Sequence, residues 1–459
     1  MKICLNNILI LLATCITTTM QGATIDVARL MQFGLPVMNI ETLDHKMPTA
    51  EYAAPPQGCI GNGIKNAEKV SGTITLYYNK TAIYNDRMTI KVRGNTSALS
   101  DKKSFGINLP EKADLLNMGG THKDKHWALI KDEDQKLFPV IGFKICELLG
   151  LQWTPKYQYV NVMLNGQYWG LYILVETVER NDECRLDVNK STGYIIEYDP
   201  YWWNEKLYFK SRLSQNYTFK YPDYDDMLQS QVDYIANTML TVENSILYGQ
   251  NYPQYIDVES FALWLIGHDI LGTWDSGGSN MFMTKYNNAA STKVMMANMW
   301  DFDTIESTKN AWSNIHSWNG FYFSYLFNNK NKEFQNTYIK KYKELSSTIF
   351  DNIISFLNDF ASSKEAGYIN MSRVLDSDRW NTSTLYSVAD NAEESIEWFT
   401  TRKTWLDNAI NKMDYTTNIK NINIANENHD NHIYDLMGNR VNGNRKGIFI
   451  YQGKKILIK

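Results

Sequence analysis

The sequence predicts an α+β fold with two lobes, a β-rich first half and a mainly helical second half. Three observations support this prediction. Apolar residues alternate at a period of two in many segments between residues 35 and 199, which is typical of strands. From Ser230 onward they recur at three- and four-residue spacings, which is typical of helices. The length of 459 residues leaves room for a sizeable core and for small additional parts.

The first half contains a series of strand signals with one helix between them. Helical spacing over Asp134–Leu149 ends at Gly150. The turn Asn165-Gly166 joins two apolar runs and indicates a hairpin. The expected strands are Leu35–Thr42, Gly72–Tyr78, Met88–Val92, Lys103–Leu109, Tyr157–Leu164, Tyr168–Val178 and Gly193–Asp199.

The second half contains long amphipathic segments. A pair of short strands, Asn280–Tyr286 and Val294–Met299, interrupts the helical pattern. The expected helices are Gln231–Thr241, Ser260–Leu271, Asn336–Phe360 and Ala389–Asn411.

Composition and charge exclude several classes of protein. Hydrophobic residues make up 44% and charged residues 21% of the chain, as in ordinary globular proteins. The net charge of −4 and the sequence pI near 6.0 argue against a dedicated nucleic-acid or anionic-membrane binder. The apolar run Val160–Val178 is interrupted by polar residues, so no transmembrane segment is expected beyond the N-terminus.

The N-terminus has the features of a secretory signal peptide over residues 1–23. Lys2 is followed by the short apolar run Ile8–Ala13 and then by small and polar residues. Leu12–Cys15 resembles a degenerate lipobox, but Thr14 departs from the small residues preferred before the cysteine, so lipidation is the less favoured alternative. After cleavage three cysteines remain, which allows one disulfide and does not require it.

The C-terminal part of the chain differs from the body in composition. Residues 413–430 are polar and rich in Asn, which predicts a linker between a body at 24–412 and a module at 431–459. The module carries six basic residues against one acidic residue, and its short apolar runs, with Gly at the turns, predict three strands.

Two clusters in the second half have the residue types needed for phosphoryl transfer. Asp275 and Asn280 lie five residues apart before a strand, and Asp301 and Asp303 end the next strand. Protein kinases use an Asp to orient the acceptor hydroxyl, an Asn five residues later to bind metal, and a second metal-binding Asp further on. Oxygen ligands suit Mg²⁺. Asp and Asn are also common in simple turns, so this spacing alone is a weak signal.

A cation falls on an apolar strand face in the first half. Lys103 is in phase with Phe105 and Ile107, and a buried cation is costly unless an anion accompanies it. The chain has no GxxxxGK[ST] or GxGxxG loop, so any phosphate binding depends on other residues.

Several separated motifs, in order, resemble the CotH kinase family, named for a bacterial spore coat protein. They cover most of residues 30–410. These motifs are Arg93–Ser97 with Lys102–Phe105, Trp127–Ile130, Val160–Glu176, Gly193–Asp199, Asp275–Asn280, Trp300–Asp303, and the late helix with Trp398, Arg402 and Trp405.

The resemblance implies a two-lobed atypical protein-kinase-like fold that binds ATP with Mg²⁺ or Mn²⁺ and phosphorylates protein Ser or Thr. By the same resemblance Lys103 would hold the nucleotide phosphates, with Lys102 its rival, and Asp275 would position or deprotonate the acceptor hydroxyl. Asn280 and Asp301 would bind the metal, with Asp303 a second candidate ligand. Arg93 would bind a phosphate or brace the loop. Glu176 would pair with Lys103 or serve as a structural acceptor, and Glu197 and Asp199 would lie in the pocket wall.

The final residues, 433–459, closely resemble the sorting domain of proteins exported through the type IX secretion system. This resemblance implies a secreted or outer-surface protein whose partners are the secretion machinery and a cell-envelope or surface protein as phosphate acceptor. The alternative is a surface binding or adhesion protein on the same fold without useful turnover, because ATP is scarce outside the cell.

Overall fold

The computed structural model places most of the chain and divides it into two compact units, residues 1–411 and 412–459. Each unit is described by itself. The structure describes residues 25–59, 64–65, 68–132, 135–274, 276–313, 315, 321–328 and 330–413, and the strand residues 433–434, 440–441, 447–451 and 454–458. The predicted signal peptide and nearly all of the predicted linker therefore lie outside the described residues.

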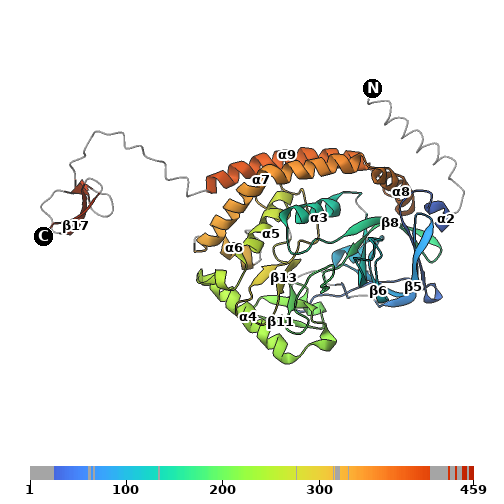
Figure 1. Ribbon diagram of the computed structural model, residues 1–459, viewed down its shortest axis with the longest axis horizontal. Helices are drawn as coiled ribbons and strands as arrows, with labels where there is room; N and C mark the ends of the chain where they lie inside the picture. The colour runs from blue at the N-terminus through green and yellow to red at the C-terminus, as the bar shows by residue number, and fades with distance from the viewer. Residues whose placement is uncertain are drawn as a thin grey trace, which may run out of the picture. The chain divides into compact units, whose positions relative to one another are not determined.

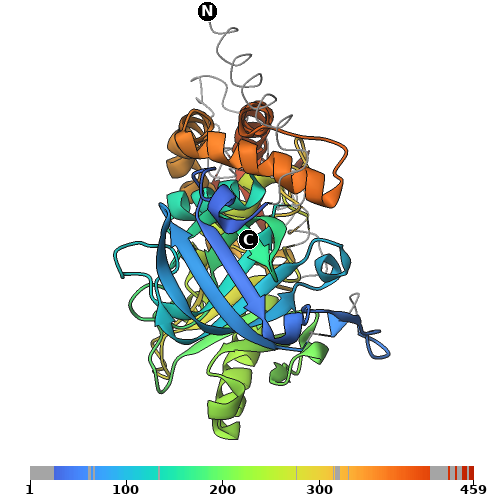
Figure 2. The same ribbon diagram turned by 90° about the vertical axis from the view of Figure 1, so that its right-hand side faces the viewer.

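A closed seven-stranded barrel forms the first half of the large unit (Figures 1 and 2). Neighbouring strands are antiparallel, except that the first strand pairs in parallel with the eighth and so closes the barrel. In order around the barrel the strands are β1 (Val37–Thr42), β4 (Val70–Tyr78), β5 (Thr81–Arg93), β6 (Ser104–Ala113), β7 (Asp124–Lys131), β9 (Gln167–Glu176) and β8 (Tyr157–Leu164).

The apolar residues that alternate in the sequence point inward and fill the interior of this barrel. On β5 and β6, for example, Ile90, Val92, Phe105 and Ile107 are buried in one apolar cluster, while Lys91 points to the other face. The predicted strands are confirmed, but the closing contact between β1 and β8 joins distant segments and was not predicted. Two short strands, β2 (Glu51–Tyr52) and β3 (Ile64–Lys65), form a separate pair.

A second sheet of five strands lies beside the barrel in the large unit (Figure 1). Its central strand continues the chain after the barrel, and the strands on either side come from later segments. In order across the sheet the strands are β11 (Tyr208–Lys210), β12 (Asn216–Tyr221), β10 (Tyr194–Tyr198), β13 (Met281–Lys285) and β14 (Val294–Met296). The pair β13 and β14 was predicted, whereas β11 and β12 were not.

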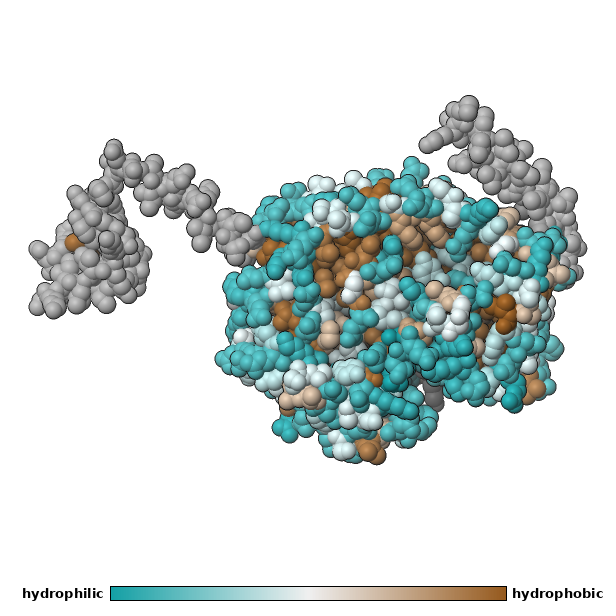
Figure 3. All heavy atoms as spheres, in the orientation of Figure 1, coloured by the Kyte–Doolittle hydropathy of each residue, from teal (hydrophilic) through white to brown (hydrophobic). Residues whose placement is uncertain are grey.

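Helices make up most of the remainder and confirm the helical second half. The long helices α7 and α9 lie side by side above α3 and α5 (Figure 1), where apolar residues gather on an otherwise largely hydrophilic face (Figure 3). The helices are α2 (Val27–Leu30), α3 (Phe138–Leu149), α4 (Gln229–Tyr248), α5 (Val258–Leu271), α6 (Phe321–Leu326), α7 (Lys332–Ala361), α8 (Lys364–Trp380) and α9 (Val388–Met413). Among the described helices, none combines the length and the apolar character that a membrane crossing needs.

Helix α8, which the sequence analysis did not predict, attaches to the barrel through buried ion pairs. The Nζ atom of Lys102 donates to both carboxylate oxygens of Asp376, at 2.7 and 2.9 Å, and to the Leu171 carbonyl at 2.9 Å. Gly170 lies against this pair, because a Cβ atom there would be 2.3 Å from Asp376 Oδ1. The barrel and the late helices are therefore joined through charges that have little contact with water.

The small unit contains a four-stranded sheet in the order β16–β15–β17–β18. Three strands were predicted; the stretch expected to form the first of them supplies two short ones. The strands are β15 (Ile433–Tyr434), β16 (Arg440–Val441), β17 (Gly447–Tyr451) and β18 (Lys454–Ile458).

Candidate functional site

The site begins at a contact between two predicted metal ligands. Asn280 immediately precedes β13, and Asp301 follows the segment after β14. The Nδ2 atom of Asn280 donates to Asp301 Oδ2 at 3.1 Å. Both residues have left-handed backbone conformations, with φ of 57° at Asn280 and 65° at Asp301. Such conformations in residues other than Gly cluster at functional sites.

The buried neighbour of Asp301 fixes the position of the turn. Phe302 is only 4% exposed and its ring packs edge-on against Phe143 of α3, with ring centroids 5.4 Å apart. The ring also lies over Gly142, where a Cβ atom would be 2.2 Å from it. A side chain at position 142 would therefore displace Phe302 and, with it, the exposed carboxylates of Asp301 and Asp303 on either side.

Arg93 of the barrel lies close to this turn. It ends β5, and its guanidinium carbon lies 5.5 Å from the centroid of the Trp300 ring. Burial lowers the pKa of Arg93, while the charges of Asp301, Glu179 and Glu197 oppose this effect. A guanidinium remains charged in proteins, so Arg93 presents a permanent positive charge beside Asp301.

A second charged group extends the site along the five-stranded sheet. Lys220 of β12 forms an ion pair with Glu197 of β10 at 2.9 Å. Asp199, two residues after Glu197, accepts hydrogen bonds from the Tyr201 backbone N–H at 2.7 Å and the Thr218 hydroxyl at 3.1 Å. Burial, and after it the charge of Glu197, raises the pKa of Asp199 to about 7. Asp199 therefore titrates near neutral pH.

Lys91 adds a third cation to the same surroundings. It lies two residues before Arg93 on β5, so both side chains leave the barrel on its outer face. Burial lowers the pKa of Lys91; the charge of Glu205 opposes this effect, and the charges of Lys69, Arg93 and Lys220 lower the pKa further. The sequence analysis missed Lys91 and Lys220 as site residues. For Lys220 the available signal was the alternation within Asn216–Tyr221, which is only six residues long.

The two lysines predicted as rivals for phosphate lie in different surroundings. Lys102 is 1% exposed and bound to Asp376, so it has a structural role in attaching α8. Lys103 is half-buried, and its ammonium donates to the carbonyls of Ala98 at 3.0 Å and Ser100 at 2.9 Å. Lys103 would reach a phosphate only by exchanging these carbonyls for phosphate oxygens.

Glu176 does not pair with Lys103. Its carboxylate is fully buried, accepts the Lys156 backbone N–H at 2.9 Å, and lies 2.9 Å from Nδ1 of His122. The prediction of a Glu176–Lys103 pair is therefore wrong, because the two side chains have different partners. Asp275, the predicted catalytic residue, lies outside the described residues.

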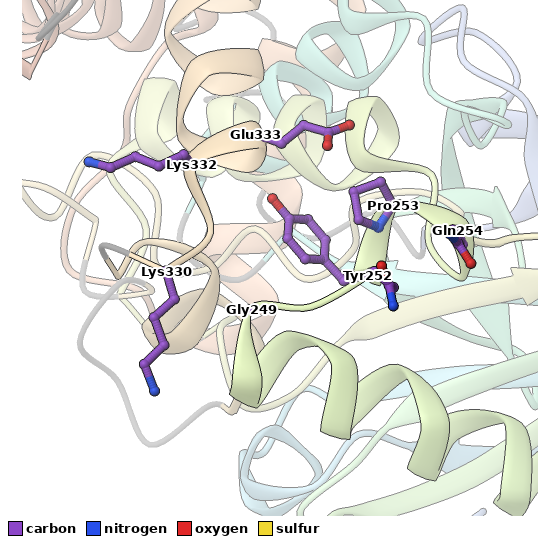
Figure 4. A pocket seen from close by; sticks show the side chains of 8 residues that line it. Gly249, Tyr252, Pro253, Gln254, Lys330, Lys332 and Glu333 are labelled. Carbon is purple, nitrogen blue, oxygen red and sulfur yellow. The ribbon is translucent and has the colours of Figure 1, made fainter.

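A recess lies elsewhere in the large unit. It has a volume of about 360 Å³ and lies between the end of α4 and the start of α7, lined by residues that include Tyr252, Lys330 and Glu333 (Figure 4). None of the predicted site residues lines it. Its walls carry no cluster of metal ligands or paired carboxylates, so it is not favoured as the reaction site.

The donor set at Asn280 and Asp301 fits a hard divalent cation. The amide nitrogen of Asn280 is directed to Asp301, which leaves the amide oxygen available to a ligand. Carboxylate and amide oxygens suit Mg²⁺ or Mn²⁺, which commonly bridge to phosphates. Residues from both halves of the sequence therefore converge on one charged site, as phosphoryl transfer requires.

Comparison with known proteins identifies the family of the chain. The family model described as CotH kinase protein matches residues 90–406, which is more than half of the chain and includes Arg93, Asn280 and Asp301. No curated protein matches the chain. The resemblance to this family noted from the sequence is thereby confirmed, and the chain belongs to the CotH kinase protein family.

Proposed function

We propose that the protein is an exported kinase that transfers the γ-phosphate of ATP to Ser or Thr of a protein, with Mg²⁺ or Mn²⁺ as cofactor. The observation that carries this proposal is the 3.1 Å contact between Asn280 and Asp301 beside Arg93. Both residues adopt the left-handed conformation, and the charge of Asp301 acts on the guanidinium of Arg93. Membership of the CotH kinase protein family supports the same activity.

Each residue has a distinct role in the proposed reaction. Asn280 and Asp301 hold the metal, which neutralises charge on the phosphates, and Asp303 is a second candidate ligand. Arg93 binds phosphate oxygens through its planar guanidinium. Asp275 orients the acceptor hydroxyl and takes its proton.

The remaining cations assist in holding the nucleotide. Lys220, fixed by Glu197, and Lys91 add positive charge on the side of the five-stranded sheet. Lys103 either braces the loop after Arg93, as its bonds to Ala98 and Ser100 indicate, or exchanges them for phosphate when ATP binds.

Export is part of the proposal. The apolar N-terminal segment resembles a signal peptide, and the basic, strand-rich residues 431–459 resemble a type IX sorting domain. We propose that the acceptor is a cell-envelope or surface protein, because the kinase would meet such proteins on its route.

The direct test is phosphate transfer by the full chain. Labelled ATP is supplied with Mg²⁺ or Mn²⁺ and a cell-envelope protein fraction. The expected result is metal-dependent labelling of Ser or Thr in a protein, absent with Asp301→Asn. Metal-dependent ATP binding without any transfer would contradict the kinase proposal.

That outcome would favour the alternative, a surface binding or adhesion protein on the same fold. One observation supports this alternative: the Lys103 ammonium is occupied by the carbonyls of Ala98 and Ser100.

A further inference from the structure

A second cluster of ligand-type side chains lies at the other end of the barrel strands. His122 precedes β7, Glu176 ends β9, and Cys184 belongs to the following loop. One ligand atom from each of the three residues lies within 4.8 Å of the others. The proposed kinase function uses none of the three.

The Glu176 carboxylate is the fixed centre of this cluster. It is fully buried, and one of its oxygens is held by the Lys156 backbone N–H at 2.9 Å. The other oxygen lies 2.9 Å from Nδ1 of His122. An imidazole and a carboxylate are thus brought together within a few ångströms of a thiol.

The buried Glu176 carboxylate has no close guanidinium partner. Arg185 lies 3.5 Å from Asp124 and 4.0 Å from both Glu176 and Glu179. Its buried Nε atom has no hydrogen-bond partner. Glu176 is therefore not closely paired with this guanidinium, and a buried carboxylate is costly unless a cation balances it.

The loop that carries Cys184 is already held in place. The Asn181 side chain donates to the Lys123 carbonyl at 2.9 Å and to Asp124 at 2.8 Å. The Trp153 indole donates to the Cys184 carbonyl at 3.1 Å. These bonds position the thiol beside the barrel, so a ligand would not have to order a free segment.

We propose that His122, Glu176 and Cys184 form a zinc site that ties the loop after β9 to the barrel. Imidazole, thiolate and carboxylate together are a zinc donor set, and magnesium or calcium would avoid the sulfur. Three protein ligands leave a fourth, tetrahedral position for water.

Zinc binding at this site requires the Cys184 thiol to lose its proton. Burial, and then the charge of Glu176, raises the pKa of Cys184 to about 11. The thiol is therefore protonated in the metal-free protein, and zinc binding releases this proton because the thiolate is the ligand.

The neighbouring group Asp124, His126 and Glu179 is the weaker candidate. Its His126 ring is hydrogen-bonded to Glu179, and this bond is the main reason why the pKa of His126 is raised. The group has no thiol among its donors, so it is less selective for zinc. The side chains of this group instead surround the proposed zinc ligands without binding the metal.

The first experiment titrates the metal-free full chain with Co²⁺ as a spectroscopic substitute for zinc. One equivalent should produce a sulfur-to-cobalt charge-transfer band, and Zn²⁺ should remove it by displacement. The band should be absent in Cys184→Ser and kept in Cys59→Ser, the matched control. Loss of an outer partner of a metal ligand weakens binding by about 10–100-fold, so His122→Gln should weaken it by at least about 100-fold.

The second experiment uses only the wild-type chain, so misfolding of a variant cannot affect its interpretation. The wild-type chain is alkylated with and without Zn²⁺, and the modified cysteines are identified by mass spectrometry. Zn²⁺ should protect Cys184 and leave Cys59, which is also half-buried, equally reactive. Equal alkylation of Cys184 with and without Zn²⁺, or a cobalt band that persists in folded Cys184→Ser, would overturn the proposal.

Discussion

Asn280 donates its side-chain amide to Asp301 across 3.1 Å, although 21 residues separate them in sequence. Both residues hold left-handed backbone conformations, and the buried ring of Phe302 fixes the turn that carries Asp301. This contact joins the two ends of the β13–β14 segment on the side that faces Arg93. The proposed metal site therefore depends on backbone geometry as well as on its ligands.

The first prediction concerns Asp301. Replacing it with Asn removes a negative charge from the proposed metal shell, so Mg·ATP affinity and phosphate transfer should both fall. Calorimetric titration measures the affinity, and circular dichroism checks the fold. Asp351→Asn, at an exposed position on α7, is the matched control and should change neither property. Unchanged ATP affinity in folded Asp301→Asn would refute the metal assignment.

The second prediction separates chemistry from binding at Asp275. If this residue addresses only the acceptor hydroxyl, Asp275→Asn should retain Mg·ATP affinity and lose about 10²–10⁴-fold in transfer rate, the usual range for one general acid–base group. Single-turnover assays at saturating ATP measure this rate. A folded variant with undiminished transfer would show that Asp275 is an ordinary turn residue.

The third prediction concerns the attachment of α8. Lys102→Met leaves the buried Asp376 carboxylate without its cation and should lower the free energy of unfolding by about 3–5 kcal/mol. The double variant Lys102→Met, Asp376→Leu should recover much of this loss, because it removes both charges. Denaturant titration measures the free energy. Lys340→Met breaks an exposed pair with Glu344 and should cost at most about 1 kcal/mol.

Local sequence pattern identified most strands because one face of each is buried. Period-two alternation identified β1 and β4, whereas the β8–β9 hairpin was identified from two apolar runs joined by the turn Asn165-Gly166. The same rule could not predict barrel closure, since the β1–β8 pairing joins segments more than a hundred residues apart.

The roles of charged residues were harder to predict than the strands. Strand phase favoured Lys103 as the cation on the apolar face, but the fully buried lysine is Lys102. Its partner is Asp376, 274 residues away on a helix with no strong amphipathic pattern. The partner of Glu176 is His122, which precedes β7 in a loop. Pairings of this kind arise from tertiary contacts that no local window contains.

The fourth prediction is a fall in stability as pH rises through neutrality. The pKa of Asp199 is about 7 in the folded chain and near 3.8 when unfolded, so between these values only the folded state keeps the proton. The free energy of unfolding should therefore decrease from about pH 5 to about pH 7, by at most about 1.4 kcal/mol per pH unit for this group. Denaturant titrations across this range measure the slope.

The variant Asp199→Asn should flatten that slope. Buried Glu306, whose pKa burial also raises to about 7, should give a similar contribution, so Glu306→Gln provides a comparison at a second site. A slope unchanged in Asp199→Asn would show that its carboxyl is ionised in the folded chain throughout this range.

The last prediction concerns Lys220, one of the two site residues that were not predicted from the sequence. Burial lowers its pKa, but the charges of Glu197, Glu205 and Asp199 outweigh this effect and raise it, so Lys220 is a cation at all pH values of interest. If it holds a nucleotide phosphate, Lys220→Met should weaken Mg·ATP binding by about 10–100-fold, the equivalent of about 1.5–3 kcal/mol for one charged hydrogen bond.

The same substitution also leaves Glu197, which is 8% exposed, without its cation and should destabilise the fold. The double variant Lys220→Met, Glu197→Gln separates the two effects, because it should restore stability without restoring ATP affinity. Lys293→Met, at an exposed position before β14, is the matched control. If the double variant regained wild-type ATP affinity, Lys220 would be only a structural partner of Glu197. The nucleotide phosphates would then be bound by Arg93 and its neighbours on β5.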